Sequence, residues 1–107
     1  MRGYVALRRR ADFARVARQG RRRTAKHLTC LVAAGPESTR VGLTVSAQVG
    51  SAVVRNLVRR RLRAILDTYA FATRLAHDIV FIARPGAGEM SFAELRAEVE
   101  RTFGPPP

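Results

Sequence analysis

The amino-acid sequence predicts an α/β fold, a sandwich in which helices pack on a single sheet. Three segments repeat apolar residues at helical spacing, and three others are continuously or alternately apolar, as strands are. These segments follow one another as helix, strand pair, helix, strand and helix. The 107 residues suffice for one domain, residues 1–107, with one modest core, and no repeat or composition break suggests a second domain.

The first predicted helix covers Asp12 to Gln19. Asp12 suits its N-cap and Gly20 its C-terminal cap. Its apolar face carries Phe13, Val16 and Ala17. Phe13 is open to two interpretations: a core side chain, or an exposed platform for aromatic stacking. Residues 21–23, all arginine, are expected to form a basic link.

Three strands are predicted. Lys26 to Ala34 and His77 to Ala83 are apolar on both faces, and the second is expected to lie centrally in the sheet. Arg40 to Ser46 alternates, which indicates a strand with one buried face. That face carries Val41, Leu43 and Val45. Gly35 to Ser38 is expected to be a turn.

Two further helices are predicted. The longer one covers Ser51 to about Tyr69, and Arg61 projects beside its apolar stripe, where we expect the charged end to reach past the edge. The stripe consists of Val54, Val58, Leu62, Ile65 and Tyr69. Ser91 and Glu94 form a capping box that opens the last helix. This helix is expected to pack through Phe92, Leu95, Val99 and Phe103.

Positive charge is the strongest functional signal. The formal net charge is +12, and residues 1–63 hold sixteen basic residues against two acids, a net +14. Such a chain is expected to bind a polyanion, most commonly nucleic acid, through its first sixty or so residues. Nineteen of the twenty basic residues are arginine, either because its planar fork suits phosphate or because of codon bias. A single cysteine, Cys30, and no visible secretory signal or membrane span fit a reducing cytosol.

The longer predicted helix carries the candidate binding chemistry. Arg55, Arg59 and Arg63 are spaced i, i+4, i+8, and Arg60 sits beside them. Guanidinium groups this close repel one another, so we expect an anion to relieve the repulsion. RNA phosphates suit that need, and Asn56 adds an amide that can donate and accept. The alternative is a solvated basic face that binds nothing specific.

The run from Gly50 to Arg63, GSAVVRNLVRRRLR, resembles the RNR motif of the bacterial ribonuclease P protein family. Arg40 to Ser46 resembles the strand that precedes this motif. Asp12-Phe13 resembles the start of the family's first helix, and His77 to Arg84 resembles its last strand. The resemblance covers nearly the whole chain, in the family's order.

The resemblance implies a subunit of a ribonucleoprotein endonuclease that matures tRNA 5′ ends. The RNA subunit would catalyse the reaction and bind most of the Mg²⁺. The protein would bind this RNA with 1:1 stoichiometry, would also bind precursor tRNA, and would act in the cytoplasm. The RNA-binding residues would be Arg55, Asn56, Arg59, Arg60 and Arg63, and a cleft for the 5′ leader would contain Phe13 and Leu31. The implied fold is a two-layer α/β sandwich like the second domain of ribosomal protein S5, with one mixed sheet and a left-handed βαβ crossover.

The sequence departs from the family pattern at several positions. Ala47 and Gln48 stand where the family usually has lysines, which removes positive charge from the expected RNA contacts. Ser51 replaces the usual asparagine, and Leu57 replaces a residue that is commonly basic. Ala17 stands where a second aromatic is frequent, which removes an aromatic ring from the expected leader cleft.

No residue is predicted to be catalytic or to bind a metal. His27 and His77 have no cysteine or carboxylate cluster at metal-ligand spacing. Two rival functions are a ribosomal or general RNA-binding protein with no associated reaction, and a protein-only nuclease. The nuclease would need a carboxylate cluster, and the acids are scattered among different predicted elements.

Overall fold

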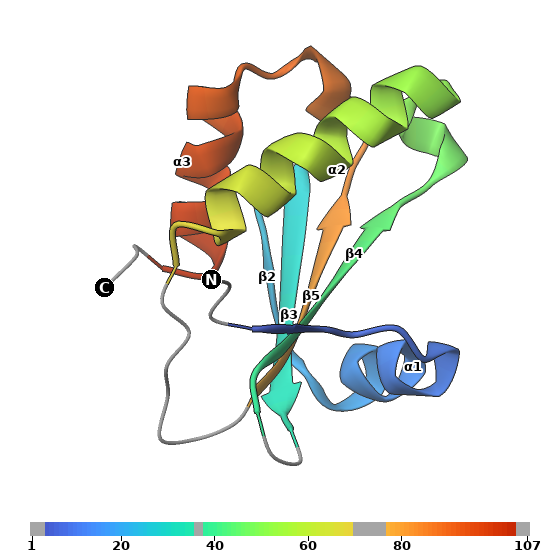
Figure 1. The fold of residues 1–107 in the computed structure, drawn as a ribbon, viewed down its shortest axis with the longest axis vertical. Helices are drawn as coiled ribbons and strands as arrows, with labels where there is room; N and C mark the ends of the chain where they lie inside the picture. Colours follow the sequence, from blue (N-terminus) through green and yellow to red (C-terminus); the bar gives the residue numbers. More distant parts are fainter. Residues whose placement is uncertain (1–3, 36–37, 70–76, 105–107) are drawn as a thin grey trace.

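The computed structural model describes residues 4–35, 38–69 and 77–104 (Figure 1). Along the chain the strands and helices are β1 (Val5–Ala6), α1 (Arg10–Gln19), β2 (Arg21–Thr24), β3 (Leu28–Ala34), β4 (Arg40–Val45), α2 (Ala52–Leu66), β5 (His77–Ala83) and α3 (Phe92–Thr102). Two short 3-10 turns, η1 (Ala47–Val49) and η2 (Ala87–Glu89), precede α2 and α3.

Within these ranges the strands form one mixed sheet in the order β1-β4-β5-β3-β2. β1 and β5 both run parallel to β4, whereas β3 is antiparallel to β5 and β2 is antiparallel to β3. β5 is therefore central, as its two apolar faces predicted. Ile79 and Phe81 point to one side of the sheet and Val80 to the other, and all three are buried.

α2 and α3 cover one face of the sheet (Figure 1). From α2, Val58, Leu62 and Ile65 are at most 1% exposed and pack in the main core, so the predicted stripe is the buried one. Tyr69 follows the helix, is also buried, and donates its hydroxyl to the Gly104 carbonyl at 2.6 Å. Burying these apolar side chains is the main force that fixes α2 on the sheet.

α1 packs on the opposite face. There Val16, Leu31 and Val80 form a second, smaller core together with Leu7 and Ala33. The ring of Phe13 lies over Gly42 of β4, where an added Cβ would come within 2.4 Å of it. Glycine at this position lets the aromatic ring approach the strand backbone closely.

β4, α2 and β5 form a βαβ unit whose two strands are parallel neighbours. With the strands pointing upward and α2 in front of the sheet, β5 lies to the left of β4 (Figure 1). The crossover is therefore left-handed, against the usual rule for such units. The predicted α/β fold with one mixed sheet is confirmed, and α1 adds cover on the second face.

Two predictions in the first half of the chain are wrong. α1 begins at Arg10 with Arg9 as its N-cap, and Asp12 lies in the first turn. The Asp12 carboxylate is instead 3.5 Å from Arg40 of β4, an ion pair that draws it away from the helix backbone. Residues 21–24 are an edge strand, not a link, because their backbone pairs with β3 although all their side chains are exposed.

Other predicted boundaries shift by a few residues. β3 begins at Leu28, α2 is capped by Ser51 and ends at Leu66, and residues 36 and 37 of the predicted turn lie outside the described ranges. The capping box that opens α3 is confirmed by both of its hydrogen bonds. Phe92 is 39% exposed and does not pack as predicted, whereas Leu95 and Val99 are fully buried.

Candidate nucleic-acid interface

The local sequence determines the residue at which α2 begins and which face of the helix is exposed to solvent. Gly50 has a φ of +154°, and Ser51 accepts a hydrogen bond from the Val54 N–H at 3.4 Å. Ser51 thus caps the helix, although asparagine is usual there in the resembled motif. Because the apolar stripe faces the sheet, the side chains of the arginines project away from the core.

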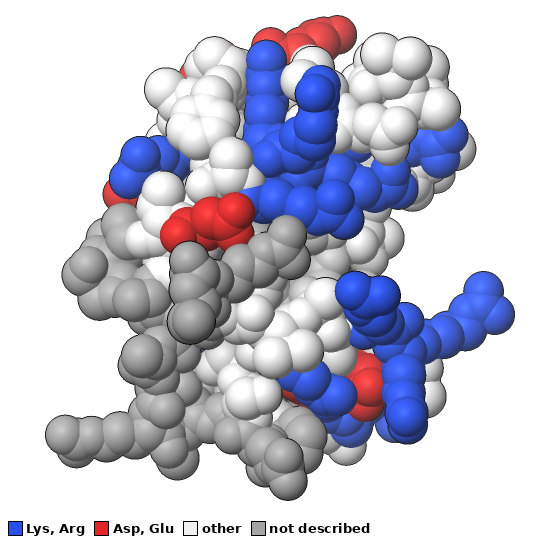
Figure 2. Space-filling model, in the orientation of Figure 1, with Lys and Arg blue, Asp and Glu red and all other residues white. Residues whose placement is uncertain are grey.

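The predicted RNA-binding residues lie together on α2. Asn56, Arg60 and Arg63 are exposed, and Arg55 and Arg59 are half-buried. Arg59 donates to the Asn56 Oδ1 at 3.0 Å and to the Val45 carbonyl at 3.5 Å, which holds its guanidinium between α2 and β4. Arginine side chains gather along α2, with a second group over α1 (Figure 2).

Carboxylates do not neutralise this surface. In the described part of the chain, no ion pair involves Arg55, Arg59, Arg60 or Arg63. The Nε of Arg55 is buried and has no hydrogen-bond partner within the same residues. A buried donor without an acceptor is unusual in a folded protein, so an acceptor from a ligand would satisfy it.

Arg61 differs from its neighbours. Its guanidinium reaches across to the backbone carbonyl of Met90, which precedes α3. This contact agrees with the predicted position of Arg61 beside the apolar stripe of α2, from which its guanidinium extends past the edge of the stripe. Arg61 therefore ties α2 to the start of α3 and belongs to the scaffold of the interface.

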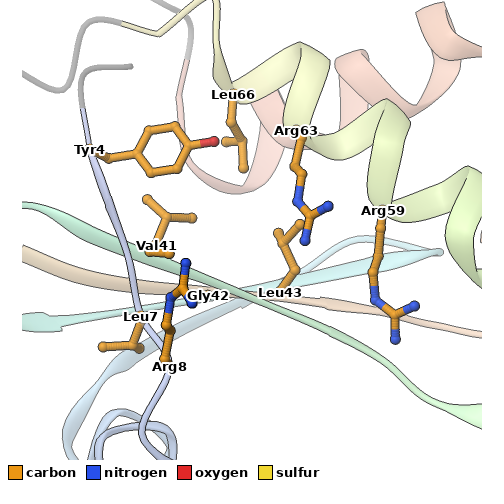
Figure 3. Close-up of a pocket in the computed structure, with 10 residues that line it drawn as sticks. Tyr4, Leu7, Arg8, Val41, Gly42, Leu43, Arg59, Arg63 and Leu66 are labelled. Atoms are coloured by element: carbon orange, nitrogen blue, oxygen red, sulfur yellow. The ribbon is translucent and has the colours of Figure 1, made fainter. Parts of the chain in front are cut away.

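A groove opens beside the arginines, between α2 and the β1 edge of the sheet (Figure 3). Its volume is about 430 Å³, and Arg59 and Arg63 of α2 face Arg8 of the β1–α1 connection across it. The other residues that line the groove, most of which have apolar side chains, are Tyr4, Ala6, Leu7, Val41, Gly42, Leu43 and Leu66. The sequence pattern did not identify Arg8 as a candidate binding residue. The feature that could have indicated it is the basic run Arg8-Arg9-Arg10.

The two residues expected in a leader cleft lie on the α1 face. Phe13 is half-buried against the smaller core, so it has both a packed and an open side, and both interpretations of it stand. Leu31 is 1% exposed beneath α1, and this burial argues against direct contact with a ligand. Ala17 is exposed on α1, where an aromatic ring would have added surface.

A buried ion cluster holds α1 on the sheet. The Asp78 carboxylate of β5 is fully buried and accepts hydrogen bonds from Arg40 Nε at 2.8 Å, from Arg40 Nη2 at 2.6 Å, and from Arg15 Nη2. Burial alone would raise the pKa of Asp78, but the hydrogen bonds and charges of Arg40 and Arg15 outweigh it and lower the pKa. Arg15 also donates to the Ala34 carbonyl at 3.1 Å, so the cluster joins α1 to three strands.

Other reactive groups are held inside the fold or are scattered. Cys30 is buried, and that burial raises the pKa of its thiol to about 12, which makes the thiol unreactive. Among residues 4–35, 38–69 and 77–104, no three His, Cys, Asp or Glu side chains gather as a metal site would require. Over the same ranges, no helix is both long and apolar enough to cross a bilayer.

Comparisons with known proteins agree with this geometry. The family model described as Ribonuclease P matches residues 1–105. The ribonuclease P protein component of Acidothermus cellulolyticus is 39% identical over 104 residues, which cover 92% of this chain and 84% of the relative. That of Symbiobacterium thermophilum is 38% identical over 107 residues, which cover 96% of this chain and 91% of the relative.

Solved structures give the same result. The Staphylococcus aureus RNase P protein superposes with a TM-score of 0.82 and 26% identity, covering 92% of this chain and 91% of that one. The Thermotoga maritima RNase P protein gives a TM-score of 0.79 and 25% identity, with 92% and 94% coverage. A match to nearly the whole chain in family, sequence and fold, together with the arginine face of α2, shows that this chain belongs to the bacterial ribonuclease P protein family, the protein subunit of the ribonucleoprotein that processes tRNA 5′ ends.

Proposed function

We propose that the chain, acting as one domain in the cytoplasm, docks on the ribonuclease P RNA subunit through Arg55, Asn56, Arg59, Arg60 and Arg63 of α2. The observation that carries this proposal is the set of arginines without a carboxylate partner in the described residues. RNA phosphates would supply the missing acceptors, and arginine's fork holds them bidentately. We expect one protein to bind each RNA subunit through this face of α2.

The same proposal places the 5′ leader of precursor tRNA against the α1 face, with the open side of Phe13 as a stacking surface. Single-stranded RNA is commonly held by aromatic rings flanked by cations. Phe13 is fixed over Gly42, and Arg9 and Arg10 lie exposed at the start of α1. Leu31 supports this surface from below through the smaller core.

Within residues 4–35, 38–69 and 77–104, the side chains do not fit a catalytic metal. Asp12 and Asp78 belong to one cluster, but the guanidinium groups of Arg15 and Arg40 contact the oxygens of both carboxylates. A cation such as Mg²⁺ would have to displace two guanidinium groups to bind there. We therefore assign Mg²⁺ and the hydrolytic step to the RNA subunit, and to this chain the binding and positioning of RNA.

Reconstitution tests the proposal. Cleavage of a precursor tRNA is measured with protein alone, RNA subunit alone and both together, across a magnesium series. We expect the protein alone to be inactive and its benefit to be greatest at low magnesium, since high ionic strength screens RNA–RNA repulsion without it. Site-specific cleavage by RNA-free protein would favour a protein-only nuclease, and binding without any gain in cleavage would favour a general RNA-binding protein.

A further inference from the structure

The groove beside α2 exists because β1 is shorter than its neighbour. β1 pairs with only the first two residues of β4, and the Leu7 N–H then donates to the Val41 carbonyl at 2.9 Å. β4 continues to Val45, past the end of β1. The carbonyls of Thr39 and Val41 point toward β1, so by strand alternation the N–H and C=O of Leu43 point to the same edge, toward the groove.

The positive charge of this groove favours an anionic ligand. Arg8 reaches in from one side, and Arg59 and Arg63, one turn apart on α2, reach in from the other (Figure 3). No acidic residue lines the groove among the described residues. Arg59 already donates to Asn56 and Val45, which leaves Arg8 and Arg63 as exposed guanidinium groups on opposite walls.

The size and the lining of the groove indicate a ligand larger than a phosphate group. Its volume of about 430 Å³ falls in the range of sites that bury a small organic molecule. The ring of Tyr4 stands at one end, the half-buried Leu43 lies on the floor, and the β4 edge supplies an amide. The half-buried Leu43, the ring of Tyr4, a backbone edge and cations together match a base attached to a phosphate.

We propose that this groove binds one unpaired nucleotide of the RNA subunit, with the phosphate between Arg8 and Arg63 and the base over Leu43 beside Tyr4. The inference rests on the proposed function, because two of the three arginines belong to the helix that docks on that RNA. Bases stacked inside a duplex cannot enter such a groove, so the nucleotide comes from a loop, bulge or end. The chain then reads a feature of RNA structure and not charge alone.

Arg8 and Arg9 provide a matched pair for the test. Both are exposed arginines at the same end of α1, but Arg9 does not line the groove and its side chain makes no capping hydrogen bond. Affinity for the RNA subunit is measured for Arg8→Ala, Arg9→Ala and Arg60→Ala. We expect Arg8→Ala to weaken binding about tenfold more than Arg9→Ala, since it removes a charged hydrogen bond as well as a charge.

A second measurement tests the base directly. The ¹⁵N-labelled protein is titrated with adenosine 5′-monophosphate, ribose 5-phosphate and inorganic phosphate. We expect the Leu43 amide signal to shift with the nucleotide and to shift little with the other two probes. The nucleotide concentration that gives half of the maximal shift should be at least fivefold higher for Arg8→Ala than for Arg9→Ala.

The outcomes separate the two proposals. If Arg60→Ala weakens RNA binding while Arg8→Ala and Arg9→Ala behave alike and Leu43 does not respond, the groove proposal is wrong and the docking proposal stands. If Arg60→Ala has no effect on affinity, the docking proposal itself is wrong. An Arg8→Ala defect seen only in the ratio of precursor to mature tRNA affinity would overturn the assignment to the RNA subunit.

Discussion

Replacement of Asp78 by asparagine tests whether the buried ion cluster determines the stability of the fold. The substitution keeps the shape of the side chain but removes the charge that Arg15 and Arg40 both contact. Two guanidinium groups then face each other across a buried neutral amide. The other carboxylate of the cluster, Asp12, is farther away, at 3.5 Å from Arg40 and 3.9 Å from Arg15.

The expected size of the effect follows from burial. Removing one partner of a fully buried ion pair costs about 3–5 kcal/mol. The side chains of Arg15 and Arg40 are 26% and 23% exposed, so water hydrates them in part and reduces that cost. We expect the free energy of unfolding to fall by about 2–3 kcal/mol, and Tm to fall by about 10 °C. A loss of that size is large for a domain whose whole stability is about 5–15 kcal/mol.

The assay is urea unfolding followed by circular dichroism at pH 7, in chloride buffer. Phosphate and sulfate are avoided because anions that bind the folded arginine face would stabilise it and mask the difference. Glu89→Gln is the matched control, since Glu89 is an exposed carboxylate outside any described ion pair. Its midpoint is expected to equal that of the unchanged protein.

The pH dependence gives a second check on the same cluster. Because the folded-state pKa of Asp78 is lowered from 3.8, its contribution is fully present above that value and is lost as pH falls through the folded pKa. The stability gap between the unchanged protein and Asp78→Asn should therefore shrink below about pH 4. Equal urea midpoints at pH 7, or a gap that persists unchanged into strong acid, would refute this reasoning.

Two further predictions concern RNA, and a third concerns the stability of α2. Arg60→Ala should weaken affinity for the RNA subunit, because one phosphate contact is lost, and should reduce the slope of log affinity against log salt concentration by about 0.7–0.9. Arg101→Ala on α3 is the control. Equal slopes for Arg60→Ala and the unchanged protein would contradict the proposed docking face. Phe13→Ala should cost about 1–3 kcal/mol of affinity for precursor tRNA but little for mature tRNA. An unfolded Phe13→Ala protein would instead show that the ring is core. Ser51→Ala should lower the free energy of unfolding by about 1 kcal/mol, as measured by urea unfolding, since it removes the cap of α2.

The sequence predicts those elements whose signal is local. The capping box at Ser91 and Glu94 depends on residues three apart, and the stripe of Val58, Leu62 and Ile65 depends on one helical period. The central place of β5 follows from its two apolar faces. Each of these features is present in the structure because tertiary packing strengthens the local preference.

Features that depend on distant partners could not be predicted in this way. Residues 21–24 show no apolar pattern, and their strand exists because the β3 backbone lies beside them. Asp12 matches an N-cap by type, but Arg40, 28 positions away, attracts its carboxylate. The groove brings Arg8 next to Arg63 only after β1 has paired with β4, and no spacing rule relates those two residues.

The arrangement of charges explains how a small, strongly basic chain folds while keeping an arginine surface available. Two buried carboxylates are committed inside the fold: Asp78 to Arg40 and Arg15, and Glu98 to His27 through a backbone N–H and a ring nitrogen at 2.9 Å each. These contacts lie on the α1 face and at α3, away from the outer side of α2. Folding therefore separates the charges, and in the proposed docking the phosphates would relieve the repulsion that persists along α2. Two RNA molecules that repel each other as polyanions would then meet across one protein, and for this reason we expect its contribution to be greatest where dissolved cations are scarce.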